Sequence, residues 1–197
     1  MGFLLMQYEY QRASREVTVH ERAGIRLNNM VERYTKRVKN MESIFQKAQD
    51  RMENNFNTLS NQASSTIQLA TSAQDANQFL RALGGIVIGG ISLAQFGQYS
   101  FSGTTDRNQL MNELSVAASQ ARANLTTLIN QVKENEMTKL EMQKDEQLQP
   151  ISEKESDLQA EQALEETLCD TWRQRKENAK SRLGEDIQNG ISKYGLK

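Results

Sequence analysis

The side chains that could carry chemistry are few in this chain, and they stand alone. His20, four residues after Glu16, is the single histidine, whereas a carboxylate-bridged di-iron bundle requires two Glu-x-x-His elements. Cys169 is the single cysteine, so the chain lacks both a disulfide pair and the several Cys or His ligands of a zinc site. We therefore expect no catalytic residue, no metal ligand and no cofactor. We interpret His20 as a surface or interhelix residue and Cys169 as a buried small residue.

The composition favours a helical protein that is not an enzyme. The 197 residues include 24 basic and 25 acidic side chains, and this balance does not favour binding to nucleic acid. Apolar residues make up 37%, below the about 45–50% of an average globular chain. A single proline and two long stretches without glycine, residues 25–83 and 104–183, predict an all-α fold. We expect an elongated helical bundle or coiled coil with no small-molecule substrate.

The first glycine-free stretch carries a heptad pattern of apolar residues. Their spacing alternates between four and three residues for about four and a half repeats, which is typical of a coiled coil or a long bundle helix. Asn55 takes one expected apolar position, and a four-residue step beyond Leu59 predicts a stutter. We expect one very long helix from about Val17, or earlier, to about Phe79, within an N-terminal region of residues 1–81. The positions of the pattern are Leu27, Val31, Tyr34, Val38, Met41, Phe45, Ala48, Met52 and Leu59.

The second glycine-free stretch repeats this pattern, and residues 106–197 are predicted to form a helical hairpin. Pro150 interrupts the stretch, and Ser152 with Glu155 has the form of a capping box. A third helix should begin there and end at Gly190, which places the turn of the hairpin near residues 147–151. A nearly continuous helix kinked at Pro150 is the alternative. Asp106 is a candidate N-cap, and the packing positions that follow it are Leu114, Ala118, Ala121, Leu125, Leu128 and Val132.

Residues 82–105 form a glycine-rich apolar corner of 24 residues without a charge. Its apolar part is shorter than the about 20 residues of a membrane-spanning helix, although Gly85 and Gly89 form a GxxxG pattern. Three interpretations compete: insertion into a bilayer, a flexible loop, or a buried turn or small β-hairpin with Gly89-Gly90 at its tip, which we favour. The residues predicted to pack there or to meet a membrane are Gly84, Gly85, Ile86, Val87, Ile88, Gly89, Gly90 and Ile91.

Two further segments are candidates for contacts with other molecules. Residues 54–74 lack charge, and 14 of these 21 residues are Asn, Gln, Ser or Thr, which favours burial against copies of the same surface. Residues 1–10, MGFLLMQYEY, form an apolar hook without the basic region, longer apolar core and cleavage site of a Sec signal peptide. The sequence leaves the location unknown, with export by a specialised secretion system and incorporation into a virion as the two alternatives considered.

A coil, a glycine-rich apolar segment and a second coil follow one another along the chain. This layout is similar to that of the small translocator and filament proteins of type III secretion systems, and to phage proteins that build or cross conduits. The sequence thus predicts a structural subunit that self-assembles through long helices into a bacterial appendage, a virion or a conduit. Its expected partners are copies of itself and other assembly proteins. The alternative is a membrane-active translocator or pore component that inserts residues 82–105.

Overall fold

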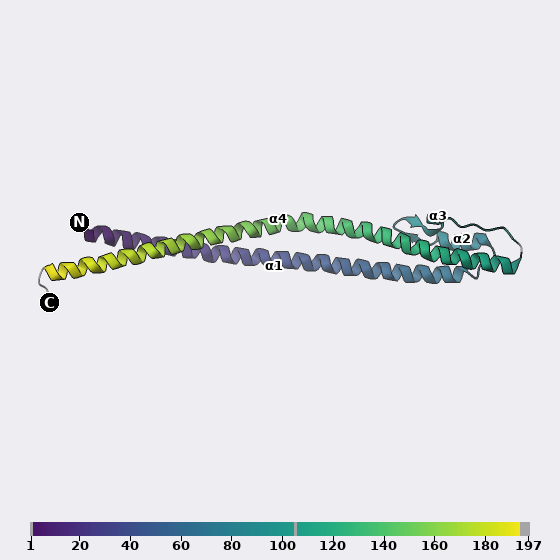
Figure 1. The fold of residues 1–197 in the computed structure, drawn as a ribbon, viewed down its shortest axis with the longest axis horizontal. Helices are drawn as coiled ribbons and strands as arrows, with labels where there is room; N and C mark the ends of the chain where they lie inside the picture. Colours follow the sequence, from purple (N-terminus) through teal and green to yellow (C-terminus); the bar gives the residue numbers. More distant parts are fainter. Residues whose placement is uncertain (1, 105, 194–197) are drawn as a thin grey trace. The chain divides into compact units, whose positions relative to one another are not determined.

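The computed structural model describes residues 2–104 and 106–193. Two long helices, α1 (Gly2–Ala70) and α4 (Arg107–Lys193), pack against each other, which confirms the predicted helical bundle (Figure 1). Between them in the sequence lie α2 (Ala76–Gly84), β1 (Val87–Ile88), β2 (Ile91–Ser92) and α3 (Leu93–Phe96). The described residues fall into two compact units. We call Glu42–Glu146 the core unit, and the residues up to Met41 together with those from Gln147 onward the coiled-coil unit.

The first long helix ends at Ala70, nine residues before the predicted end near Phe79. Beyond it the hydroxyls of Thr71 and Ser72 donate to the carbonyl oxygens of Gln68 and Leu69, so polar side chains satisfy the last turn. Asp75 then accepts a hydrogen bond from the backbone N–H of Gln78 at 2.8 Å and caps a new helix, α2. Local hydrogen bonding by short polar side chains therefore breaks the predicted helix.

The register of α1 differs from the predicted heptads at one point. Leu59 is 41% exposed, whereas Phe56 packs against the core, so Leu59 does not belong to the face of α1 that packs within the chain. The inward positions step by four residues from Ala48 to Met52 and again to Phe56. The stutter thus occurs before Asn55 and not after Leu59, because the large ring of Phe56 fills the core better than an amide at Asn55 would.

The core unit buries a continuous hydrophobic cluster with contributions from α1, α2, the β-hairpin, α3 and α4. Phe79 of α2 lies fully buried within it and makes edge-to-face contacts with Tyr99 and Phe101, at ring-centroid distances of 6.4 and 6.0 Å. Leu83 and Leu93 are also fully buried. The apolar residues of the corner therefore complete a core that the two long helices alone would leave open on one side.

The corner contains the small β-hairpin that the sequence predicts. Val87 pairs with Ser92 and Ile88 with Ile91, antiparallel, and Gly89-Gly90 form the tip. The φ angles of these glycines are 57° and 83°, a left-handed conformation that other residues adopt only with strain. Gly85 caps the end of α2, so the Gly85-to-Gly89 spacing does not lie on a helix face and is not a helix-packing motif.

The second long helix is continuous, so the predicted hairpin with a turn at residues 147–151 is wrong and the alternative, a helix through Pro150, is closer to the structure. Pro150 lacks an N–H and removes one helical hydrogen bond, but packing against α1 outweighs that loss. Glu155 does not cap a helix, because its carboxylate accepts a hydrogen bond from Thr35 of α1 at 2.5 Å. Gly190 lies inside α4. Asp106 does cap α4, as predicted, by accepting from the N–H of Asn108.

Candidate assembly surfaces

The predicted heptad residues face the opposite helix of the same chain. In the coiled-coil unit Leu27, Val31, Tyr34, Val38 and Met41 are partly buried. In the core unit Phe45 is buried, Ala48, Met52 and Val132 are partly buried, and the remaining predicted positions of α4 are fully packed. These fully packed residues are Leu114, Ala118, Ala121, Leu125 and Leu128. Apart from Leu59, the heptad surface is therefore used within the chain, and contacts between chains need other surfaces.

The corner residues divide between the core and the exterior. Ile86 and Ile88 are buried, whereas Val87 and Ile91 are 54% and 42% exposed. Gly89 approaches α4 so closely that a Cβ atom there would lie 2.7 Å from both Cγ atoms of Val132. Of the other glycines, Gly84 is partly buried and Gly85 and Gly90 are exposed. The close contact of this hairpin is thus made to the chain's own helix.

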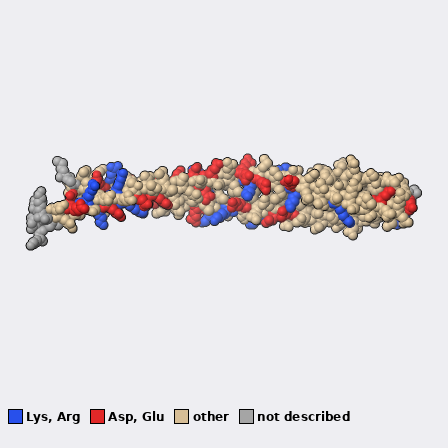
Figure 2. Space-filling view, viewed as in Figure 1, with Lys and Arg blue, Asp and Glu red and all other residues tan. Residues whose placement is uncertain are grey.

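An almost uncharged surface covers a large part of the core unit. Residues 54–132 hold six of the chain's 24 basic and 25 acidic side chains, three of each sign. Figure 2 shows the contrast between a nearly tan region and regions dense in red and blue. The exposed large apolar residues on this surface are Leu59, Leu69, Val87, Ile91, Met111 and Val116. We call residues 54–132 with these exposed side chains the uncharged surface.

Two open grooves lie on the uncharged surface. The first has a volume of about 450 Å³ and runs between the turn at Thr71–Gln74 and the start of α4, where Met111 lines it. The second, of about 630 Å³, lies between the segment after α3 and α4, where Val116 lines it. Most of the side chains that line both grooves are uncharged. Each groove has one charged lining residue, Arg107 in the first and Glu113 in the second.

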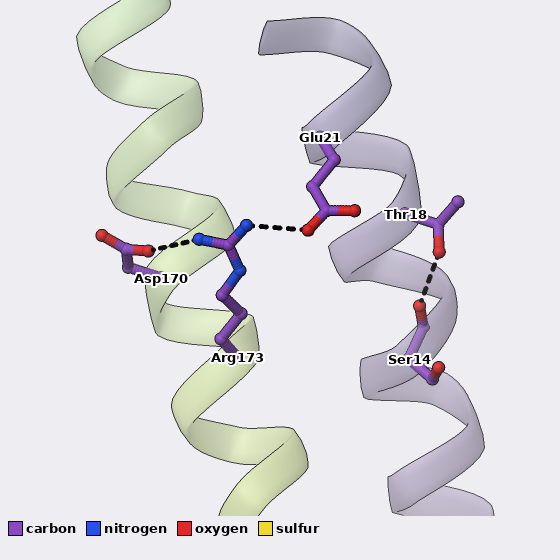
Figure 3. Close-up of polar contacts among 5 residues, drawn as sticks. All are labelled: Ser14, Thr18, Glu21, Asp170 and Arg173. Carbon is purple, nitrogen blue, oxygen red and sulfur yellow. Dashed lines mark hydrogen bonds and ion pairs between the residues drawn. The ribbon is translucent and has the colours of Figure 1, made fainter. Parts of the chain in front are cut away.

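The coiled-coil unit carries several polar contacts between α1 and α4 beside its apolar seam. His20 Nδ1 lies 2.6 Å from the Glu165 carboxylate, so His20 is the interhelix residue that we expected. Arg173 donates to Glu21 of α1 at 2.7 Å and to Asp170 of its own helix at 3.1 Å (Figure 3). The hydrogen bond to Glu21 raises the pKa of Arg173 above its ordinary value. On α1, the Thr18 hydroxyl donates to the Ser14 carbonyl oxygen and takes no part in the contacts of Arg173 (Figure 3).

A groove that the sequence analysis missed surrounds Trp172 in the coiled-coil unit. It has a volume of about 350 Å³, and Arg12, Arg175 and Arg182 are among its lining residues. The guanidinium carbons of Arg12 and Arg175 lie 5.7 and 4.7 Å from the centre of the Trp172 ring. The seven-residue spacing of Arg175 and Arg182 on a predicted helix was the available sequence signal, but the contribution of Arg12 depends on the pairing of α1 with α4.

The remaining predicted features are placed as follows. Cys169 is buried, as expected, on the seam between α1 and α4. The N-terminal hook forms the start of α1, with Phe3, Leu4 and Tyr8 exposed. Among the described residues there is no group of three or more His, Cys, Asp or Glu side chains that could hold a metal ion. No described helix combines the length and the apolar character needed to cross a membrane.

Comparison with known protein families, with curated proteins and with solved structures finds no match to this chain.

Proposed function

We propose that this chain is a non-enzymatic structural subunit that self-assembles into a bacterial appendage, a virion or a conduit. The observation that carries the proposal is the uncharged surface of the core unit. Charged side chains make up 25% of the whole chain, whereas only six of the 79 residues in this segment are charged. The cores of protein interfaces are depleted in charge in the same way.

The chemistry of the uncharged surface suits contact with copies of itself. The acidic and basic side chains within residues 54–132 balance, so two copies of the surface do not repel each other. Leu69 and Met111, which are 73% and 58% exposed, supply apolar area that is removed from water on contact. The Asn, Gln, Ser and Thr side chains of residues 54–74 can both donate and accept hydrogen bonds, so identical segments can pair.

Self-assembly is tested by sedimentation velocity and negative-stain microscopy of the purified chain over a range of concentrations. We expect oligomers at micromolar concentration, and a 22.4 kDa monomer at high concentration would contradict the proposal. Exchanging both Leu69 and Met111 for Lys places charge on the uncharged surface without disturbing the core, and we expect assembly to be lost. Ile25→Lys is the matched control, because Ile25 is 63% exposed on the coiled-coil unit, outside that surface.

A membrane-active translocator that inserts residues 82–105 is the second candidate function. Val87 and Ile91 favour it, because both are exposed beside the hairpin tip. Insertion would have to remove Ile88 and Leu93 from the core, where they are 2% and 0% exposed. Flotation with liposomes separates the candidates. If the wild-type chain does not bind lipid, Ile88→Asp should leave the fraction of protein that floats unchanged. Strong flotation of the wild-type chain that Val87→Asp abolishes would favour the translocator.

A further inference from the structure

We propose that the groove over Trp172 in one copy of the chain binds a row of carboxylates on α4 of a second copy. The tryptophan groove comprises Arg12, Trp172, Arg175 and Arg182, and the carboxylate row comprises Glu153, Asp157 and Glu161. The inference rests on the proposed self-assembly and adds to it a second contact, of opposite character to the uncharged surface.

The three arginines of the tryptophan groove have guanidinium groups that make no ion pair with a described residue. The guanidinium carbons of Arg12 and Arg175 lie 5.7 and 4.7 Å from the centre of the Trp172 ring, so both cations are positioned by the same aromatic side chain. The N–H groups of a guanidinium match the geometry of a carboxylate. Glu9 also lines the groove, but the three guanidinium groups outnumber its carboxylate.

A protein partner fits this groove better than a nucleic acid does. Trp, Tyr and Arg are the residues that most often dominate the binding energy of protein interfaces. Trp172 and the three arginines provide that combination, and Lys176 lies 5.9 Å over the ring of Tyr10 beside them. The chain as a whole has a net charge of −1, which gives no long-range attraction for a polyanion.

The carboxylate row supplies the complementary chemistry within the same sequence. Glu153, Asp157 and Glu161 are four residues apart, so they lie along one side of α4, and all three are exposed. None of them forms an ion pair with another described residue. The row spans about 12 Å of helix, and Arg175 and Arg182 are separated by about 10 Å, so the two sets have similar lengths.

The row and the groove cannot meet within one chain. Asp157 and Arg175 are 18 residues apart on the same continuous helix, which separates them by about 27 Å along its axis. The groove of one copy must therefore engage the row of another. Because the row and the groove both lie on α4, two antiparallel copies can each place their row in the other's groove, whereas a contact made on one side only generates rings or open filaments.

Fluorescence tests the groove directly, since Trp172 is the only tryptophan of the chain. The protein, diluted until it sediments as a monomer, is titrated with a synthetic peptide of residues 149–166. We expect a saturable change in emission that weakens at least tenfold in apparent affinity between 0.05 and about 1 M salt. The matched control peptide carries Glu153→Gln, Asp157→Asn and Glu161→Gln. Equal binding of both peptides would overturn the proposal, as would an equal response to inorganic phosphate or to a single-stranded oligonucleotide.

Charge reversal tests the contact in the assembly. The groove variant is Arg12→Glu, Arg175→Glu and Arg182→Glu, and the row variant is Glu153→Lys, Asp157→Lys and Glu161→Lys. Each should reduce the assembled fraction at least tenfold, and the chain that carries both sets should recover it. The control, Arg26→Glu with Arg33→Glu and Lys39→Glu, makes the same charge change at exposed positions outside the groove. Circular dichroism checks that each variant keeps its helices.

The outcomes separate this inference from the proposed function. If the wild-type chain assembles and the groove variant assembles equally well, the charge-paired contact is wrong and self-assembly stands. If the wild-type chain never assembles, the proposed function is wrong, and the peptide titration alone decides whether the groove binds carboxylates. If both single variants lose assembly but the combined variant does not recover it, the pairing of these two sets is wrong.

Discussion

The core unit and the coiled-coil unit are built on the same two helices, α1 and α4, but they differ in the side chains they bury and in their charge. The core unit buries large side chains such as Phe79, Leu114 and Leu128, and its residues 54–132 carry only six charged side chains. The buried residues of the coiled-coil unit are Ala13, Val17, Leu158, Cys169 and Ala179, and the unit is rich in charge. The difference indicates that hydrophobic stabilisation is larger in the core unit than in the coiled-coil unit.

This division has a physical cause in the number of elements that pack together. In the core unit α2, the β-hairpin and α3 cover α1 and α4, so a side chain can be enclosed on every side. In the coiled-coil unit two helices meet alone, and many side chains on their seam, such as Leu27 and Val31, stay partly exposed. Polar residues such as His20 and Glu165 are therefore tolerated on that seam, because they can pair across it.

The largest expected effect comes from removing the centre of the core unit. Phe79→Ala deletes a ring that is fully buried between Tyr99 and Phe101, and we expect the free energy of unfolding to fall by about 3–5 kcal/mol. Urea denaturation followed by far-ultraviolet circular dichroism measures it. Leu164→Ala, at a side chain that is 60% exposed in the coiled-coil unit, is the control and should change little. A loss below about 1 kcal/mol at Phe79 would remove the contrast between the units.

The hairpin tip offers the next largest effect. Gly89→Ala imposes a side chain at a φ of 57° and places its Cβ against Val132, so we expect a loss of about 1–3 kcal/mol. Gly90→Ala is the matched control: its φ is also positive, but nothing lies within 4 Å of the added atom, so only backbone strain remains. Thermal unfolding of both variants separates strain from clash. Equal losses would mean that the hairpin does not press on α4.

In the coiled-coil unit, the contact between His20 and Glu165 should have a smaller effect. His20→Ala leaves the partly buried carboxylate without its partner, and we expect about 1 kcal/mol of destabilisation. Trp172 lies in the same unit, so its fluorescence during urea unfolding reports the change. A double-mutant cycle with Glu165→Gln isolates the pair. Strictly additive effects would show that the two side chains do not stabilise each other.

Where local chemistry decided the structure, the sequence was sufficient to predict it. Two adjacent glycines between β-branched residues indicate a tight hairpin, and Gly89-Gly90 form its tip. Asp106 follows an uncharged loop and precedes a helical pattern, and it caps α4. In both features a local signal, adjacent glycines or a capping side chain, agrees with the packing, which explains why both predictions are confirmed.

Where tertiary packing decided the structure, the sequence was misleading. Pro150 is a strong local signal for a break, yet α4 continues through it, because its flanking segments pack on α1. Leu59 continues the heptad spacing, yet Phe56 fills the core instead. The tryptophan groove joins Arg12 to Trp172 across 160 positions of sequence, so no local pattern could identify it.

The smallest effect that we predict concerns an exposed ion pair of the coiled-coil unit. Lys36 donates to the Glu32 carboxylate at 2.6 Å one helical turn away, and this hydrogen bond and charge hold the pKa of Glu32 below its ordinary value. Because the pKa is lower in the folded chain than in the unfolded chain, the pair contributes stability at neutral pH. That contribution is lost as the pH falls through the lowered pKa.

Lys36→Met should return the pKa of Glu32 towards its ordinary value, measured from the carboxyl ¹³C shift during a pH titration. Lys39→Met is the matched control, because Lys39 is also exposed but makes no ion pair with any described residue. Both side chains of the pair are open to solvent, so 1 M salt should abolish the difference. If the pKa of Glu32 stays lowered in Lys36→Met, groups other than Lys36 must lower it. The charges of the coiled-coil unit could then not be treated as independent pairs at the surface.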